Sequence, residues 1–182
     1  MTDEKSPYDQ SLLSEVRRNY QLMVRPMDAY TLVQATAIVW IRPELETVLM
    51  RLQKIDDPAK IDYSVLDEGG TLSSQDVKKS IDEATHNARI ELLRHSYRTL
   101  EKARFGVRDE EKLPLLEAVT KMHHLLGVKD FKLSILDRSG QTSDADMRGK
   151  ITSAIGIAES RLNTDLLTRD RWSQMGDGGA TR

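Results

Sequence analysis

The sequence contains an internal repeat, in which residues 132–162 match residues 62–92 at an offset of 70 positions. Ten of the 31 aligned positions are identical. The identical pairs are Ser64/Ser134, Leu66/Leu136, Asp67/Asp137, Gly70/Gly140, Ser73/Ser143, Asp76/Asp146, Ile81/Ile151, Ala84/Ala154, Ala88/Ala158 and Leu92/Leu162. A segment that occurs twice predicts two copies of one structural unit, so this repeat constrains the fold more than any other feature.

The matched positions lie where a helix requires them. Ser73 and Ser143 each precede an acidic residue by three positions, which is the pattern of a helix N-cap with an acid in the first turn. The last four identical pairs have helical spacing and predict a buried stripe. Upstream, residues 45–52 align with residues 115–122 as a shorter helix. Each copy is therefore predicted to contain a helix, a short extended arm, a glycine turn and a long helix.

The rest of the chain favours an all-α fold of about five to six helices. Only 5% of the residues are aromatic, and long stretches without Gly or Pro are rich in good helix formers. The predicted helices cover residues 27–41, 43–52, 114–127 and 144–172, together with a long helix that begins after Ser73 in the Gly- and Pro-free stretch 71–105. The end of the first helix could also be a short core strand. Pro43 and Pro114 fit first helical positions, and Gly127 fits a helix C-terminus.

The repeat defines the predicted domain organisation. Residues 1–182 form one helical domain, with a first copy at about 43–105, a second at about 113–172, and flexible ends at 1–9 and 175–182. We expect the two equivalent arms, 62–66 and 132–136, to lie close together and to pair as a minor two-stranded ribbon.

The long helix of the first copy carries two apolar stripes, which predicts that it is sandwiched between layers. One stripe consists of Val77, Ile81, Ala84, Ala88 and Leu92, and the other of His86, Ile90, Leu93, Tyr97 and Leu100.

Composition excludes several classes of protein. Lys and Arg number 27 against 29 Asp and Glu, a net charge of −2, so no global field attracts the chain to nucleic acid or an anionic membrane. The absence of Cys excludes disulfide scaffolds, thiol catalysis and thiolate zinc sites. The polar first ten residues do not resemble a targeting signal, and the longest apolar run, residues 37–41, is too short for a membrane span. We therefore expect a soluble, cytoplasmic protein.

Two patterns are candidates for a metal site. The glycine turns at 69–76 and 139–146 resemble the second half of an EF-hand loop, but alignment places Val65 and Ile135, which cannot bind calcium, at its first position. Glu83 and His86 form the Glu-x-x-His pair of di-iron bundles, but the second copy lacks it. We therefore predict capped turns and no metal.

Motifs of enzymes are also missing. The chain has neither a G-x-S-x-G elbow nor an H-E-x-x-H motif. Residues 148–152, RGKIT, lack the upstream glycine of a phosphate loop and the Ser or Thr directly after its lysine. His123 and His124 point about 100° apart on a helix and cannot chelate one ion, so a packed His123 is expected. The chain is predicted to need no cofactor, and a non-catalytic role is favoured.

Two helix faces are candidates for binding. Arg94, Arg98 and Lys102 repeat every four residues and form a possible phosphate-binding strip, although salt pairs with nearby glutamates would also explain them. A ridge of small residues runs along the last helix, opposite its apolar stripe; its members are Gly149, Ser153, Gly156 and Ser160. This ridge is either an interface that another helix approaches closely or an exposed face that tolerates weak helix formers.

Each copy pairs a Leu-rich helix with an acid-capped helix that reads I-x-x-A, in IDEA at 81–84 and ITSA at 151–154. This pattern resembles the helical connector proteins of virion head–tail junctions, and the resemblance implies a role in assembly. It covers less than half of the chain. Three functions are thus expected, in this order: an assembly or interaction subunit that binds itself or a partner protein, a nucleic-acid-associated accessory protein, and an enzyme or ligand binder with a site between the copies.

Overall fold

The computed structural model describes residues 8–25 and 32–176, with side chains up to residue 163. Over these residues all regular structure is helical, in five α-helices and five 3₁₀ helices, which confirms the predicted all-α class. The chain forms two compact units, residues 1–92 and residues 93–182. None of the helices in the described ranges is long and apolar enough to cross a membrane.

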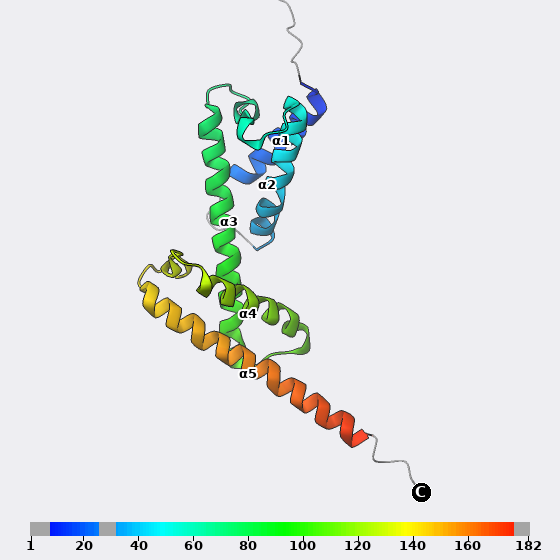
Figure 1. Ribbon diagram of the computed structural model, residues 1–182, viewed down its shortest axis with the longest axis vertical. Coiled ribbons are helices and arrows are strands. Elements are labelled where there is room, and N and C mark those ends of the chain that lie inside the picture. Colours follow the sequence, from blue (N-terminus) through cyan, green and yellow to red (C-terminus); the bar gives the residue numbers. More distant parts are fainter. Residues whose placement is uncertain (1–7, 26–31, 177–182) are drawn as a thin grey trace, which may run out of the picture. The chain divides into compact units, whose positions relative to one another are not determined.

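The first unit contains α1 (Gln10–Val24), α2 (Leu32–Gln53), the 3₁₀ helices η1 (Pro58–Lys60) and η2 (Tyr63–Leu66), and the first part of α3 (Ser74–Lys102). Figure 1 shows α1 and α2 side by side. The side chain of Asp9 begins α1 by accepting hydrogen bonds from the backbone N–H groups of residues 11 and 12. The largest fully buried side chains of this core are Met23, Leu45, Leu49, Leu66 and Ile81.

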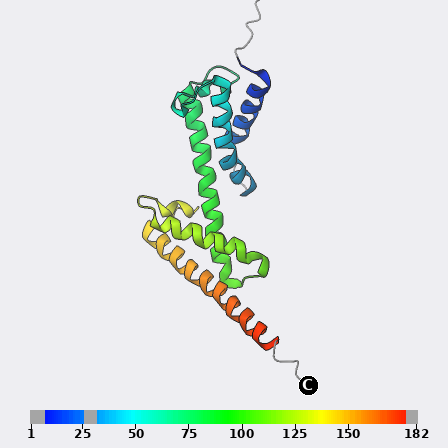
Figure 2. The ribbon, with the colours of Figure 1, turned by 45° about the vertical axis from the view of Figure 1, so that its right-hand side comes forward.

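The second unit contains the end of α3, then η3 (Ala103–Phe105), η4 (Asp109–Glu111), α4 (Lys112–Gly127), η5 (Leu133–Leu136) and α5 (Asp144–Gly176). Helices α4 and α5 lie side by side in both ribbon views (Figures 1 and 2). The largest fully buried side chains of this core are Leu100, Leu115, Met122, Leu133 and Ile151.

Helix α3 belongs to both units, which corrects the prediction that it is sandwiched between layers. Of its first stripe, Val77, Ile81 and Ala88 are buried in the first core, whereas Tyr97 and Leu100 of its second stripe are buried in the second core. The two stripes therefore serve successive parts of the helix. His86, assigned to the second stripe, is exposed.

Helix α2 corrects the predicted boundary at Pro43. The helix runs through this residue without interruption, and Pro43 is exposed. Residues 27–31 of the predicted helix 27–41 lie outside the described residues, and the rest of that segment is helical rather than a strand. Helix α4 agrees better with the prediction, since Pro114 lies in its first turn and the helix ends at Gly127.

The two arms are also different from the prediction. Residues 63–66 and 133–136 each form one 3₁₀ turn at equivalent positions, and the described part of the chain contains no β-strand. In the first arm the Asp62 carboxylate accepts a hydrogen bond from the Ser64 N–H at 2.9 Å, which favours a turn over extended backbone. The arms thus lack the extended backbone that a two-stranded ribbon requires.

The predicted helix N-caps are confirmed in both units. Ser73 Oγ accepts from the Asp76 N–H at 3.2 Å, and Ser143 Oγ accepts from the Asp146 N–H at 3.1 Å. Both serine hydroxyls also donate to the acidic side chain at 2.6 Å. Each hydroxyl satisfies an N–H group that the first turn leaves without a helical partner.

The glycine turns have matching geometry as well. Gly70 and Gly140 have φ values of +62° and +68°, which glycine adopts without the strain a side chain would cause. Asp67 accepts hydrogen bonds from the N–H groups of residues 69, 71 and 72, and Asp137 accepts from those of residues 139 and 142. The carboxylates that the sequence offers for calcium are thus used to close the turns.

Candidate functional site: a basic pocket in the second unit

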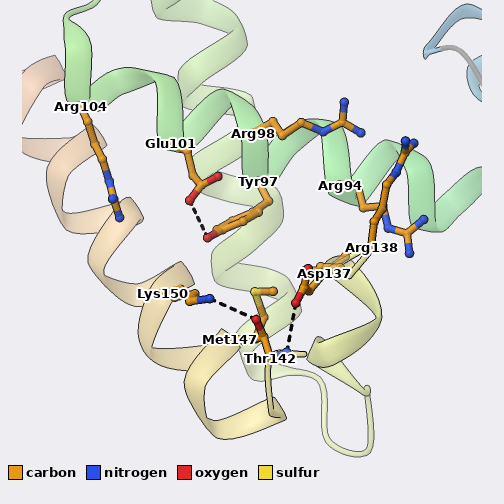
Figure 3. A pocket seen from close by; sticks show the side chains of 11 residues that line it. Arg94, Tyr97, Arg98, Glu101, Arg104, Asp137, Arg138, Thr142, Met147 and Lys150 are labelled. Carbon is orange, nitrogen blue, oxygen red and sulfur yellow. Dashed lines mark hydrogen bonds between the residues drawn. The ribbon is translucent and has the colours of Figure 1, made fainter. Parts of the chain in front are cut away.

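A pocket of about 370 Å³ lies within the second unit, between the end of α3, the turn after η5 and the first half of α5. Its lining includes five cationic side chains, which are Arg94, Arg98, Arg104, Arg138 and Lys150. Figure 3 shows Arg104 and Lys150 on one side of Tyr97 and Glu101, and Arg94 and Arg138 on the other. The cluster concentrates positive charge around one hollow.

Arg94 forms one wall of the pocket and connects two elements. Its Nε and Nη2 donate to the carbonyl oxygen of Ile135, at 3.1 and 2.6 Å, and thereby tie α3 to η5. One turn further along α3, the hydroxyl of Tyr97 donates to Glu101 at 2.8 Å. Burial, this hydrogen bond and the charge of Glu101 raise the pKa of Tyr97 above its ordinary value, so the phenol stays protonated at neutral pH.

A second part of the lining is built on the turn that follows η5. Hydrogen bonds from Thr142 and Ser139 lower the pKa of Asp137 far below its ordinary value, so this carboxylate is ionised at neutral pH. Lys150 donates to the hydroxyl of Thr142 at 3.1 Å, which places the ammonium beside the same turn.

The electrostatics of the pocket favour an anionic ligand. Five cations outnumber two carboxylates, Glu101 and Asp137, and both carboxylates accept hydrogen bonds from neutral groups of their own unit. Guanidinium groups bind phosphate and carboxylate oxygens through two parallel hydrogen bonds, and an ammonium adds a point charge. The arrangement can therefore hold an anion.

The first unit repeats the frame of the pocket, which consists of an arginine that donates to an arm carbonyl, a buried tyrosine three residues later and the capped glycine turn. Arg17 Nε on α1 donates to the carbonyl oxygen of Val65 at 2.9 Å, and Val65 is the counterpart of Ile135 at the offset of 70. Tyr20 stands three residues after Arg17, as Tyr97 does after Arg94, and both tyrosines are 8% exposed. The helices that carry these side chains both contain the motif R-x-x-Y, at 17–20 and at 94–97. They align at an offset of 77 positions, whereas the turns align at an offset of 70.

The frame is shared, but most of the positive charge is not. The counterparts of Arg98, Arg138 and Lys150 in the first unit are Gln21, Glu68 and Ser80. Arg94 and Asp137 are matched by Arg17 and Asp67, so these two positions belong to the common architecture. The remaining cations are additions of the second unit, and the frame does not require them.

The structure brings only part of the predicted Arg94–Arg98–Lys102 strip together. Arg94 and Arg98 line the basic pocket, whereas Lys102 lines a different hollow with Phe105 and Val107. Sequence reasoning missed Arg104, which lies in η3 just after the strip and outside its four-residue period. It also missed Arg138 and Lys150, which are distant along the chain and which only the fold brings to this pocket. The repeated R-x-x-Y is the signal in the sequence that could have found the frame.

The small-residue ridge of α5 lies on an exposed face. Gly149, Ser153, Gly156 and Ser160 are all exposed. A Cβ atom added at Gly149 or at Gly156 would meet no atom within 4 Å. No described residue therefore packs against the helix at either glycine, and contact with another subunit stays a prediction.

The remaining candidate residues have ordinary surroundings. Glu83 and His86 are both exposed. The expectation that His123 is packed is wrong, since its side chain is 55% exposed and its Nε2 lies 2.9 Å from Glu159 Oε1. Met122 takes the buried position beside it. No group of three or more His, Asp or Glu in the described ranges could hold a metal ion.

Comparison of the chain with protein-family models, with curated proteins and with solved structures gives no match.

Proposed function

We propose that the protein is a nucleic-acid-associated accessory protein, and that it binds phosphate groups in the basic pocket of the second unit. The observation that carries this proposal is the set of five cations around one hollow, in a chain whose net charge is −2. A local concentration of this kind attracts a partner to one place rather than to the whole surface.

The proposed role is binding and not catalysis. Tyr97, Glu101 and Asp137 are the groups in the pocket that could act as an acid or a base. The raised pKa of Tyr97 keeps its hydroxyl protonated, Glu101 accepts a hydrogen bond from that hydroxyl, and Asp137 closes the turn after η5. The cations that remain are suited to holding charge. The lining thus offers electrostatic recognition and no activated nucleophile.

Binding of a mixed-sequence single-stranded oligonucleotide, followed by fluorescence anisotropy over a series of salt concentrations, tests this proposal. We expect the logarithm of the affinity to fall linearly with the logarithm of the salt concentration. Replacing Arg98 and Lys150 together by Gln should make that slope shallower by about 0.7 for each phosphate that the pocket no longer neutralises. Lys102→Gln is the matched control, because it removes one cation of the same helix outside the pocket.

Circular dichroism should show unchanged helicity in all three proteins, since the replaced side chains are exposed. Wild-type protein that does not bind the oligonucleotide at low salt contradicts the proposal. An equal decrease of affinity in the control and in the double variant contradicts the assignment to this pocket.

A second function, assembly with copies of itself or with a partner protein, is favoured by the outer face of α2. Val33, Ala37 and Trp40 lie on one face of this helix, and Val33 and Trp40 are 79% and 75% exposed. Exposed apolar groups that cluster on one face are typical of interaction sites, and aromatic residues are enriched there. This face lies in the first unit, so assembly and anion binding would use different parts of the chain.

A further inference from the structure

We infer that the pocket recognises a phosphomonoester carried by a nucleotide, that is, the terminal phosphate of a nucleic-acid strand or of a free mononucleotide, rather than an internal phosphodiester. This inference rests on the proposed function and names the chemical group that the site binds.

The shape of the pocket favours the terminal phosphate of a nucleic-acid strand over a phosphate inside its backbone. The cations stand around a hollow of about 370 Å³, within the range of small-ligand pockets, and do not follow one line along a surface. An internal phosphodiester continues into a sugar on both sides, so the strand must bend into the hollow and out again. A terminal phosphate has one substituent and can enter with the strand leaving through the mouth.

The charge of the pocket fits a dianion better than a monoanion. A phosphodiester carries one negative charge, whereas a phosphomonoester carries about −1.5 to −2 at pH 7 and offers three acceptor oxygens. The lining carries five cationic and two anionic side chains, a formal charge of +3. Arg104 and Arg138 stand on opposite sides of Tyr97 (Figure 3), so two guanidinium groups can approach one phosphate from different directions.

The floor of the pocket has an apolar part beside the cations. Leu136 and Met147, which are 5% and 2% exposed, line it together with the ring of Tyr97. These groups give the sugar or base next to a bound phosphate an apolar surface to contact. All three belong to the core of the second unit, so the fold holds this apolar surface in place.

The first unit shows that the cations are not needed to build this frame. It retains the arginine-to-carbonyl hydrogen bond, the buried tyrosine and the capped turn, yet it has Gln21, Glu68 and Ser80 where the second unit has cations. Removing charge at Arg138 or Lys150 is therefore expected to leave the fold intact.

The experiment measures binding of the full chain to one oligonucleotide sequence prepared in three forms: with a 5′-phosphate, with a 3′-phosphate and with hydroxyl groups at both ends. We expect at least one phosphorylated form to bind about tenfold more tightly than the hydroxyl form. This preference should decrease as the pH is lowered through about 6, where the phosphomonoester gains a proton. Arg104→Gln with Arg138→Gln should abolish the preference, and Lys102→Gln should retain it.

Competition identifies the source of the phosphate. A nucleoside monophosphate that displaces the phosphorylated strand supports the inference, and inorganic phosphate should compete at least tenfold more weakly because it lacks the sugar and base. A phosphoserine peptide that competes more tightly than the nucleotide overturns the assignment to nucleic acid.

The two proposals fail in different ways. Equal binding of all three oligonucleotide forms overturns this inference and leaves the proposed function standing. Binding of the mononucleotide without binding of any strand supports recognition of the phosphomonoester and overturns the proposed function. Absence of binding to every probe overturns both.

Discussion

At the residue scale, the clearest repeated device is the aspartate that closes each glycine turn. Asp67 and Asp137 accept hydrogen bonds from successive backbone N–H groups, and these bonds lower the pKa of both carboxyl groups. The ionised form of each carboxylate is therefore better stabilised in the folded chain than in the unfolded chain.

This difference predicts an acid-dependent loss of stability. A carboxyl group whose pKa is lower in the folded state contributes stability above its unfolded pKa, near 4, and loses that contribution as the pH falls through the folded value. We expect Asp67→Asn and Asp137→Asn each to lower the melting temperature at pH 7. The difference from wild type should shrink as the pH falls below about 4. Glu68→Gln, one residue along the same turn, is the control, and a constant difference at all pH values would contradict the explanation.

At the element scale, α5 presents two exposed glycines on the face opposite its core stripe. Glycine within a helix costs about 0.8 to 1 kcal/mol relative to alanine, and leucine is nearly as good a helix former as alanine. Because nothing lies within 4 Å of either position, we expect Gly149→Leu with Gly156→Leu to raise the free energy of unfolding by roughly 1 to 2 kcal/mol. Urea denaturation measures this change.

The same double variant tests the interface hypothesis. An unchanged mass in light scattering agrees with an exposed face, whereas a shift toward monomer would show that another helix approaches the ridge. Ser153→Ala should leave the mass unchanged in either case, since it adds no bulk.

Several elements can be predicted from the sequence because their signals are local. The starts of α3 and α5 follow from a serine and an acid three residues apart, and the buried faces follow from helical spacing. Pro43 is misleading, because its preference for a first turn is weaker than the packing of the buried residues on both sides of it in α2, Ile38 and Leu45. The prediction of extended arms fails because alternation over five residues also fits a short turn.

At the scale of the whole molecule, the basic pocket could not be predicted, although two of its residues belong to the predicted strip. Arg94 and Arg98 follow a visible helical period, but Arg104, Arg138 and Lys150 come from three further elements. No pattern of neighbouring residues in the sequence predicts that these elements lie next to one another. The helical period also groups Lys102 with Arg94 and Arg98, although Lys102 lines a different hollow.

Assembly is also a property of the whole molecule. We expect the mass of the wild-type chain in light scattering to increase with concentration, because the apolar face of α2 is exposed. Trp40→Gln should abolish this increase, and Leu116→Gln, which replaces an exposed apolar side chain in the second unit, should not. A wild-type mass that equals the monomer over the whole concentration range would contradict assembly through this face.

The sharing of α3 by two units also bears on how the chain folds. The side-chain hydrogen bonds that fix the turns join residues 48 positions apart in the first unit and 41 in the second. Each bond joins residues of one unit only, so each turn can form without the other unit. During synthesis, we expect the first unit to fold once residue 92 has emerged from the ribosome. The completed half of α3 then offers a formed helical end on which the next ten residues can add turns without a new nucleation step.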